Sequence, residues 1–193
     1  GGVAKTTTVA SLGAALVDEG KRVLLVDLDP QGCLTFSLGA DPDKLPVSVH
    51  EVLLGEVEPG AALVTTAEGM TLLPANIDLA GAEAMLLMRA GREYALKRAL
   101  AKIADRFDVI IIDCPPSLGV LTLNGLTAAD DVIVPLQCET LAHRGVGQFL
   151  RTERGCDQQE AIGPHQSGVE HVTFADREIL AEDRQAARRA RRH

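Results

Sequence analysis

Apolar runs and amphipathic stretches follow one another along the chain and predict strands and helices in turn. Short runs of β-branched residues and Leu, typical of strands buried on both faces, occur at residues 22–27, 71–74, 109–113 and 131–136. Longer stretches with helical spacing predict helices over residues 6–19, 77–88, 92–105, 117–129 and 142–151. Strands that alternate with helices indicate an α/β fold, with a parallel sheet covered by helices on both faces.

Local signals mark where some of these elements begin and end. Gly20 supplies the left-handed conformation that ends the first helix. Ser48 and Glu51 have the spacing of a capping box and predict a short helix that begins after Ser48. Gly91 separates two of the predicted helices from each other.

The pattern changes near residue 152. No buried-strand run follows Leu136, and the chain ends in Arg-Arg-Ala-Arg-Arg-His. We therefore expect a compact domain over residues 1–152 and a divergent, Arg-rich, poorly ordered tail over residues 153–193.

Composition narrows the class of protein. The 193 residues carry a formal charge of −8 and contain no Trp, so the core is aliphatic and the surface is not basic throughout. This charge argues against a domain that coats nucleic acid over its whole surface, and it leaves a local basic patch open. The four Cys show no CxxC pairing, which fits a reducing compartment. Because the chain has neither a signal peptide nor an apolar run of membrane-spanning length, we expect a soluble cytoplasmic protein.

A Gly-rich segment stands directly before the first predicted helix, and its residues are Gly1, Gly2, Val3, Ala4, Lys5, Thr6 and Thr7. Glycines let backbone N–H groups converge on phosphate oxygens, and a helix N-terminus adds positive potential. A Lys here reaches the β- and γ-phosphates, and the following Thr can bind Mg²⁺. We interpret the segment as a phosphate-binding loop, although Ala4 stands where the usual pattern has Gly. A Gly-rich loop before an ordinary helix is the alternative.

Two predicted strands bring carboxylates to one edge of the sheet. Asp27 and Asp29 lie at the end of the strand at residues 22–27, and Asp113 ends the strand at residues 109–113. Open α/β sheets bind ligands at the carboxyl ends of their strands. An apolar strand that ends in Asp is also the Walker B arrangement, which holds a metal-bound water. Each Asp alone would equally fit a helix cap or a solvated turn, but together with the loop they predict a nucleotide site.

These segments resemble the ParA/Soj partitioning ATPases, a branch of the deviant Walker-A superfamily that includes MinD. The matching segments follow the family's order: GGVAKTTT, RVLLVDLDPQG, SVHEVLLGE, LLPANIDLAGAE, FDVIIIDCPPSLGVLTLNGLTAAD and VIVPLQCE. The resemblance implies a P-loop NTPase fold, with an incomplete ATPase domain over residues 1–152. The family's first strand and signature lysine, which precede the position of Gly1, are missing, and its C-terminal strands are absent or unrecognisable. Truncation, a shifted reading frame and a genuine variant ending all stay open.

The resemblance also implies a role for each matching residue. Lys5 and Asp29 are the catalytic residues, with Asp29 orienting the attacking water. Thr6 binds Mg²⁺ directly and Asp113 binds it through water, and Asp29 is a further candidate ligand. The nucleotide-binding residues are Gly1, Gly2, Val3, Ala4, Lys5, Thr6 and Thr7.

At the level of function, the resemblance implies a nucleoid-associated DNA-segregation ATPase of a chromosome or a plasmid, with ATP and Mg²⁺ as cofactors. It further implies a nucleotide-dependent homodimer, a centromere-binding partner of the ParB type, and DNA bound without sequence preference. A MinD-like ATPase that cycles on membranes is the alternative, although the last stretch, residues 177–193, offers only Ile179 and Leu180 as apolar anchors. Two further hypotheses are a nitrogenase-like iron–sulfur reductase that uses Cys114 and Cys138, and a non-hydrolysing fragment or scaffold.

Overall fold

The computed structural model describes residues 4–117, 119–135 and 170–174. Its α-helices are α1 (Lys5–Asp18), α2 (Cys33–Ser37), α3 (Val49–Leu54), α4 (Leu79–Leu86), α5 (Ala95–Leu100) and α6 (Val120–Ala128). Its strands are β1 (Val23–Asp27), β2 (Val64–Thr65), β3 (Thr71–Leu73), β4 (Val109–Asp113), β5 (Asp131–Ile133) and β6 (Glu170–Phe174). Short 3-10 helices lie at Pro42–Lys44, Pro59–Ala61, Arg92–Tyr94 and Ala104–Arg106.

The strands form one sheet in the order β2-β3-β1-β4-β6-β5. All neighbouring pairs are parallel except β2 and β3, which are antiparallel. In the central pair, β1 and β4 run in register, with Asp27 opposite Asp113. Because parallel strands end at the same edge, this register brings both carboxylates to one place.

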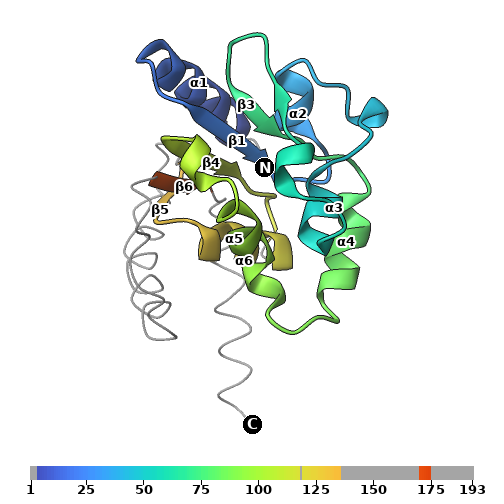
Figure 1. Cartoon of the computed structure of the whole chain (residues 1–193). Coiled ribbons are helices and arrows are strands. Elements are labelled where there is room, and N and C mark those ends of the chain that lie inside the picture. The colour runs from blue at the N-terminus through green and yellow to red at the C-terminus, as the bar shows by residue number, and fades with distance from the viewer. Residues whose placement is uncertain (1–3, 118, 136–169, 175–193) are drawn as a thin grey trace, which may run out of the picture.

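Helices cover both faces of the sheet (Figure 1). Successive side chains of a strand point to opposite faces, so β1 and β4 each contribute to two cores. On one face, Leu25 and Ile111 pack in a core with Val9 of α1. On the other face, Leu24 and Ile110 pack in a larger core with residues of α3 to α6. The α/β fold with helices on both faces is therefore confirmed.

Most predicted elements are present, with shorter helices. The strands at residues 71–74 and 109–113 and the first helix agree with β3, β4 and α1 to within a residue. The capping box is also present: the Ser48 hydroxyl accepts from the His50 N–H, and Glu51 accepts from the Ser48 N–H. The helices predicted on either side of Gly91 shorten to α4 and α5, because Gly91 adopts a left-handed conformation and a 3-10 turn follows it.

Two strands were not predicted from the sequence. β2 is too short to form an apolar run and pairs antiparallel, so the sheet is mixed rather than wholly parallel. β6 lies after Leu136, where the sequence shows no buried-strand run, and it pairs with both β4 and β5. Its sequence, Glu-His-Val-Thr-Phe, mixes polar and apolar residues and therefore does not resemble a buried strand. The helix predicted at residues 142–151 lies outside the described residues, as does most of the predicted tail.

Within the described ranges, no helix is long and apolar enough to cross a membrane.

Candidate nucleotide-binding site

The first turn of α1 begins at an unusual residue. Ala4 lies directly before the helix with φ 59° and ψ 25°, the left-handed region. It is the one non-glycine residue with positive φ in the described part of the chain. This conformation costs an L-residue roughly 1–2 kcal/mol, so the turn that leads into α1 is strained. No side chain caps the first turn of α1, which leaves its N–H groups directed toward the open end of the helix.

Lys5 and Thr6 both bind Asp113, from a strand end more than a hundred residues away. The Lys5 Nζ donates to Asp113 Oδ1 at 2.7 Å, and the Thr6 Oγ1 donates to Asp113 Oδ2 at 2.7 Å. Lys5 also donates to the Cys114 carbonyl. Lys5 and Asp113 are buried, with side-chain exposures of 9% and 1%. The fold thus joins the predicted loop lysine, the predicted Mg²⁺ ligand and the Walker B aspartate in one cluster.

Burial sets the electrostatics of this cluster. Removal of the Asp113 carboxylate from water raises its pKa, and the nearby Asp29 charge raises that pKa further. The Lys5 charge and the hydrogen bonds from Lys5 and Thr6 lower the pKa of Asp113 and offset part of the rise. A buried carboxylate of this kind is costly without its cation, so Lys5 and Asp113 depend on each other.

The remaining predicted residues are only partly placed. Asp29 is half-buried at the end of β1, and its carboxylate accepts from the Gln31 N–H at 2.9 Å. Its charge acts on Asp113, but it makes no ion pair with Lys5 among the described residues. Thr7 is exposed on the first turn of α1. Gly1, Gly2 and Val3 lie outside the described residues.

Asp27 and Thr35 form a second buried group. The sequence placed Asp27 at the ligand-binding edge of the sheet without a specific role, and it did not single out Thr35. Asp27 is fully buried, and burial raises its pKa to about 7. Its Oδ2 accepts from the Thr35 N–H at 2.9 Å and the Thr35 hydroxyl at 2.7 Å, and its Oδ1 accepts from the Asp29 N–H at 3.0 Å. The sequence did hold a signal for this group. Asp27 is a charged residue directly after four buried apolar ones, and it stands six residues before Cys33, where α2 begins.

The side chains present fit a nucleotide with Mg²⁺. The uncapped first turn of α1 and the Lys5 ammonium are donors suited to phosphate oxygens. The Thr6 hydroxyl and the Asp113 carboxylate, 2.7 Å apart, are hard oxygen ligands of the kind that Mg²⁺ takes beside phosphate. Cys114 is packed in the apolar core rather than displayed for a cluster, and Cys138 lies outside the described residues.

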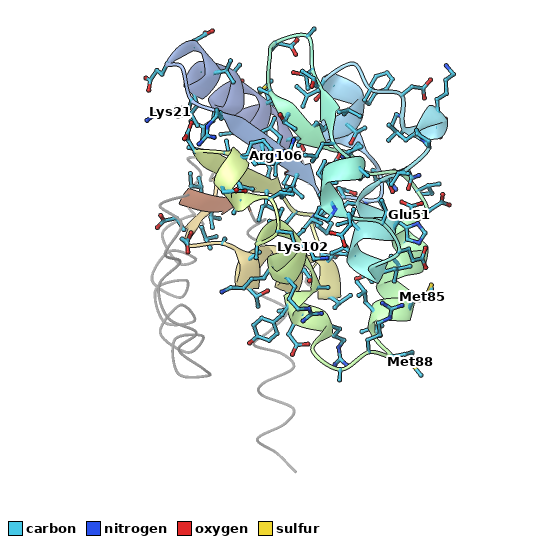
Figure 2. All side chains as sticks on the ribbon, viewed as in Figure 1. Lys21, Glu51, Met85, Met88, Lys102 and Arg106 are labelled. Atoms are coloured by element: carbon cyan, nitrogen blue, oxygen red, sulfur yellow. The ribbon has the colours of Figure 1, made fainter. Side chains whose placement is uncertain are left out.

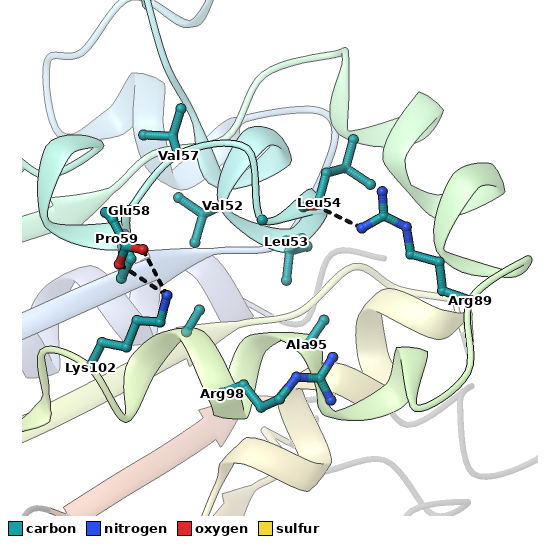
Figure 3. A pocket seen from close by; sticks show the side chains of 12 residues that line it. Val52, Leu53, Leu54, Val57, Glu58, Pro59, Arg89, Ala95, Arg98 and Lys102 are labelled. Atoms are coloured by element: carbon teal, nitrogen blue, oxygen red, sulfur yellow. Dashed lines mark hydrogen bonds and ion pairs between the residues drawn. The ribbon is translucent and has the colours of Figure 1, made fainter.

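Two other surface features of the described residues share no residue with this site. A hollow of about 310 Å³ lies between α3 and α5, with Lys102 paired to Glu58 on one side and Arg89 donating to the Leu54 carbonyl on the other (Figure 3). Met85, in the last turn of α4, and Met88, just after this helix, point away from the body of the molecule (Figure 2). None of these groups belongs to the Lys5–Asp113 cluster.

Comparison with known proteins places these motifs in a family. The model of an AAA domain matches residues 1–161. The chain is 49% identical over 155 residues to the sporulation initiation inhibitor protein Soj of Bacillus subtilis, which covers 80% of this chain and 61% of that protein. It is 46% identical over 188 residues to the chromosome-partitioning ATPase Soj of Treponema pallidum, covering 95% of this chain and 72% of that protein.

Solved structures agree on the fold. The chain is 71% identical to a Mycobacterium smegmatis protein described as cobyrinic acid a,c-diamide synthase with bound ADP and magnesium, with a TM-score of 0.78 over 96% of this chain and 78% of that one. It is 27% identical to the McdA protein of Cyanothece, with a TM-score of 0.74 over 91% of this chain and 67% of that one.

The chain spans 61% of the length of the Bacillus subtilis Soj protein and 72% of the Treponema pallidum one. The predicted family is confirmed by these matches. This chain belongs to the ParA/Soj family of P-loop ATPases.

Proposed function

We propose that this protein is a DNA-partitioning ATPase that binds ATP with Mg²⁺, dimerises when ATP is bound, and hydrolyses it. In this proposal it acts on nucleoid DNA together with a centromere-binding partner of the ParB type. The observation that carries the proposal is the convergence of Lys5, Thr6 and Asp113 at the N-terminus of α1. The partitioning role is supported by relatives described as chromosome-partitioning proteins in Treponema pallidum, Myxococcus xanthus and Caulobacter vibrioides.

Each side chain has a part in this proposal. The first-turn N–H groups of α1 and the Lys5 ammonium bind the phosphates, so Lys5 exchanges Asp113 for the nucleotide. Mg²⁺, when bound, neutralises charge on the phosphate oxygens. Thr6 would hold that ion directly and Asp113 through water, and Asp29 would orient the attacking water. Support for the cofactors comes from the Mycobacterium smegmatis proteins, whose structures are described with bound ADP and magnesium and with an ATP analogue and magnesium.

A second candidate comes from the description of those same proteins as cobyrinic acid a,c-diamide synthases. A protein with this activity would also bind ATP and Mg²⁺, so the Lys5–Asp113 cluster fits both functions. The two functions differ in what reacts with ATP. In a diamide synthase, ATP would drive the conversion of cobyrinic acid carboxylates to amides. In a partitioning ATPase, water would attack the terminal phosphate.

The proposed function is tested with the full-length protein. We expect MgATP turnover without cobyrinic acid, a dimer by light scattering with ATP but not with ADP, and DNA retention that weakens as salt rises. Adding a ParB-type partner with its DNA is expected to raise turnover. ATP-dependent amide formation from cobyrinic acid, with turnover that requires this substrate, would instead establish the second candidate.

A further inference from the structure

The buried carboxylate of Asp27 holds two segments at once, one with each oxygen. Oδ1 accepts from the backbone N–H of Asp29, at 3.0 Å. Oδ2 accepts from the Thr35 N–H at 2.9 Å and the Thr35 hydroxyl at 2.7 Å. Asp27 therefore connects the segment that carries Asp29 to the start of α2.

The Thr35 hydroxyl extends this connection to a third segment. While it donates to Asp27, its oxygen accepts from the Ala75 N–H at 2.9 Å, just after β3. Both partners and Thr35 itself are fully buried. A buried hydroxyl that both donates and accepts has its position fixed in two directions, because losing either bond leaves a polar group unpaired.

The neighbouring residue of Asp29 is anchored as well. The Leu28 N–H donates to the Asp113 carbonyl at 2.9 Å, on the side of β4. The backbone is thus held at residue 28 by β4 and at residue 29 by Asp27. These two bonds, and the turn closed by the Gly32 N–H on the Asp29 carbonyl, restrain the backbone that carries the Asp29 side chain. The Gln31 N–H also donates to the Asp29 carboxylate.

We propose that Asp27 and Thr35 are positioning residues that fix the Asp29 carboxylate in its place beside the Lys5–Asp113 cluster. The inference rests on the proposed function, in which Asp29 orients the attacking water. Neither residue touches the phosphate-binding groups, so their effect is on geometry during hydrolysis rather than on nucleotide affinity. An error of about 1 Å in such a group lowers a rate by roughly 10²-fold.

The test is Thr35→Val in the full-length protein, which keeps the branched shape and removes both hydroxyl bonds. We expect kcat for ATP to fall by about 10–100-fold, as when outer-shell partners are removed elsewhere. The Kd for MgATP is expected to stay within about threefold, because no phosphate-binding group changes. Thr35→Ser keeps the hydroxyl and should restore kcat.

Thr66→Val is the matched control. Thr66 is also buried, and its hydroxyl has no hydrogen-bond partner in the described structure, so this change removes no bond and should leave kcat and Kd unchanged. If Thr35→Val does not fold, Asp27→Asn gives the same test. It replaces one acceptor oxygen by a donor that faces N–H groups, and it is expected to lower kcat with Kd preserved.

The outcomes are distinct. A parental kcat in Thr35→Val or Asp27→Asn, or a loss of affinity that matches the loss of kcat, overturns the positioning role. Failure of Thr35→Ser to restore kcat does the same. Asp29→Ala tests the proposed function separately: parental hydrolysis in that variant removes the water-orienting role from Asp29, whatever Thr35 does.

Discussion

The two ends of the β1–β4 strand pair each carry an acid paired with a base, in opposite surroundings. Where the strands begin, Arg22 and Asp108 lie 2.8 Å apart, with side-chain exposures of 58% and 38%. Where the strands end, Lys5 and Asp113 lie 2.7 Å apart, with exposures of 9% and 1%. The distances are nearly equal, so burial is what separates the two pairs.

The pKa values of Asp108 and Asp113 shift in opposite directions, because one carboxylate is exposed and the other is buried. The hydrogen bonds from Arg22 lower the pKa of Asp108 to about 2. Burial raises the pKa of Asp113 even though a lysine contacts it, and it raises the pKa of Asp27 at the same edge to about 7. An exposed pair such as Arg22–Asp108 contributes little to stability. A buried pair is costly in itself, and such perturbed groups gather where a protein binds or reacts.

Asp113→Ala is expected to have the largest effect on folding. It leaves the Lys5 ammonium buried with only a carbonyl partner, a change that typically costs about 3–5 kcal/mol. Urea unfolding of the nucleotide-free protein measures this loss, and MgATP binding should also lose its dependence on Mg²⁺. Asp108→Ala, at the exposed end, is the control. Equal losses of stability in the two variants would show that the ends do not differ.

Lys5→Ala should dominate nucleotide affinity, because it removes a full charge from beside the β- and γ-phosphates. We expect the Kd for MgATP to rise by roughly 10²-fold or more, as for loss of a charge-assisted contact. Calorimetry measures the change, and Lys21→Ala, at the opposite end of the sheet, is the matched control. Unchanged affinity in Lys5→Ala would remove this residue from the site.

Asp27 should make the free energy of unfolding fall as pH rises. Because its folded pKa is raised to about 7, the folded state binds the proton more tightly than the unfolded state does. Its contribution to stability is therefore fully present below its ordinary pKa and is lost as pH rises through about 7. Urea unfolding of the parent and of Asp27→Asn from about pH 5 to 8 should show this slope in the parent alone. Parallel curves would contradict the assignment.

Ala4→Gly should raise stability by a smaller amount. Ala4 is exposed, so the change loses no packing and relieves a left-handed conformation worth roughly 1 kcal/mol. A higher Tm is the expected readout. Ala10→Gly, within α1, is the control and should lower the Tm. If both variants lower the Tm, the turn before α1 is not strained.

Arg22→Ala is expected to have the smallest effect. The pair with Asp108 is exposed, so a slight fall in Tm is expected, smaller still at high salt, with no change in nucleotide affinity. A fall in Tm as large as that of Asp113→Ala would remove the contrast between the two ends.

The parts of the fold that the sequence predicted are those with a local signature. β4 is a continuous apolar run and α1 a regular helical stretch that ends at a glycine, so both were found with nearly correct bounds. Lys5, Thr6 and Asp113 were also predicted to share one site, because each belongs to a motif whose place at a sheet edge or helix start is fixed. Their roles in that site stay predictions.

What the sequence missed depends on contacts between distant segments. Nothing local in Thr35 indicates that its hydroxyl lies between Asp27 and Ala75, since those partners come from other elements. β6 was missed for the same reason: the partners that make it a strand lie far earlier in the chain. The role of Asp29 stays a prediction, because its geometry matters only with a nucleotide in place.

The position of β6 has a consequence for how the chain folds as it is made. Among the described strands, β6 lies between β4 and β5 in the sheet, although it follows both in the sequence. β4 and β5 therefore join the same sheet only after β6 has been made. During synthesis at roughly 5–20 residues per second, several seconds pass between the synthesis of β4 and that of β6, which pairs with its edge. An unpaired strand edge is a template for association with other chains, so the edge of β4 is open to such association during this interval.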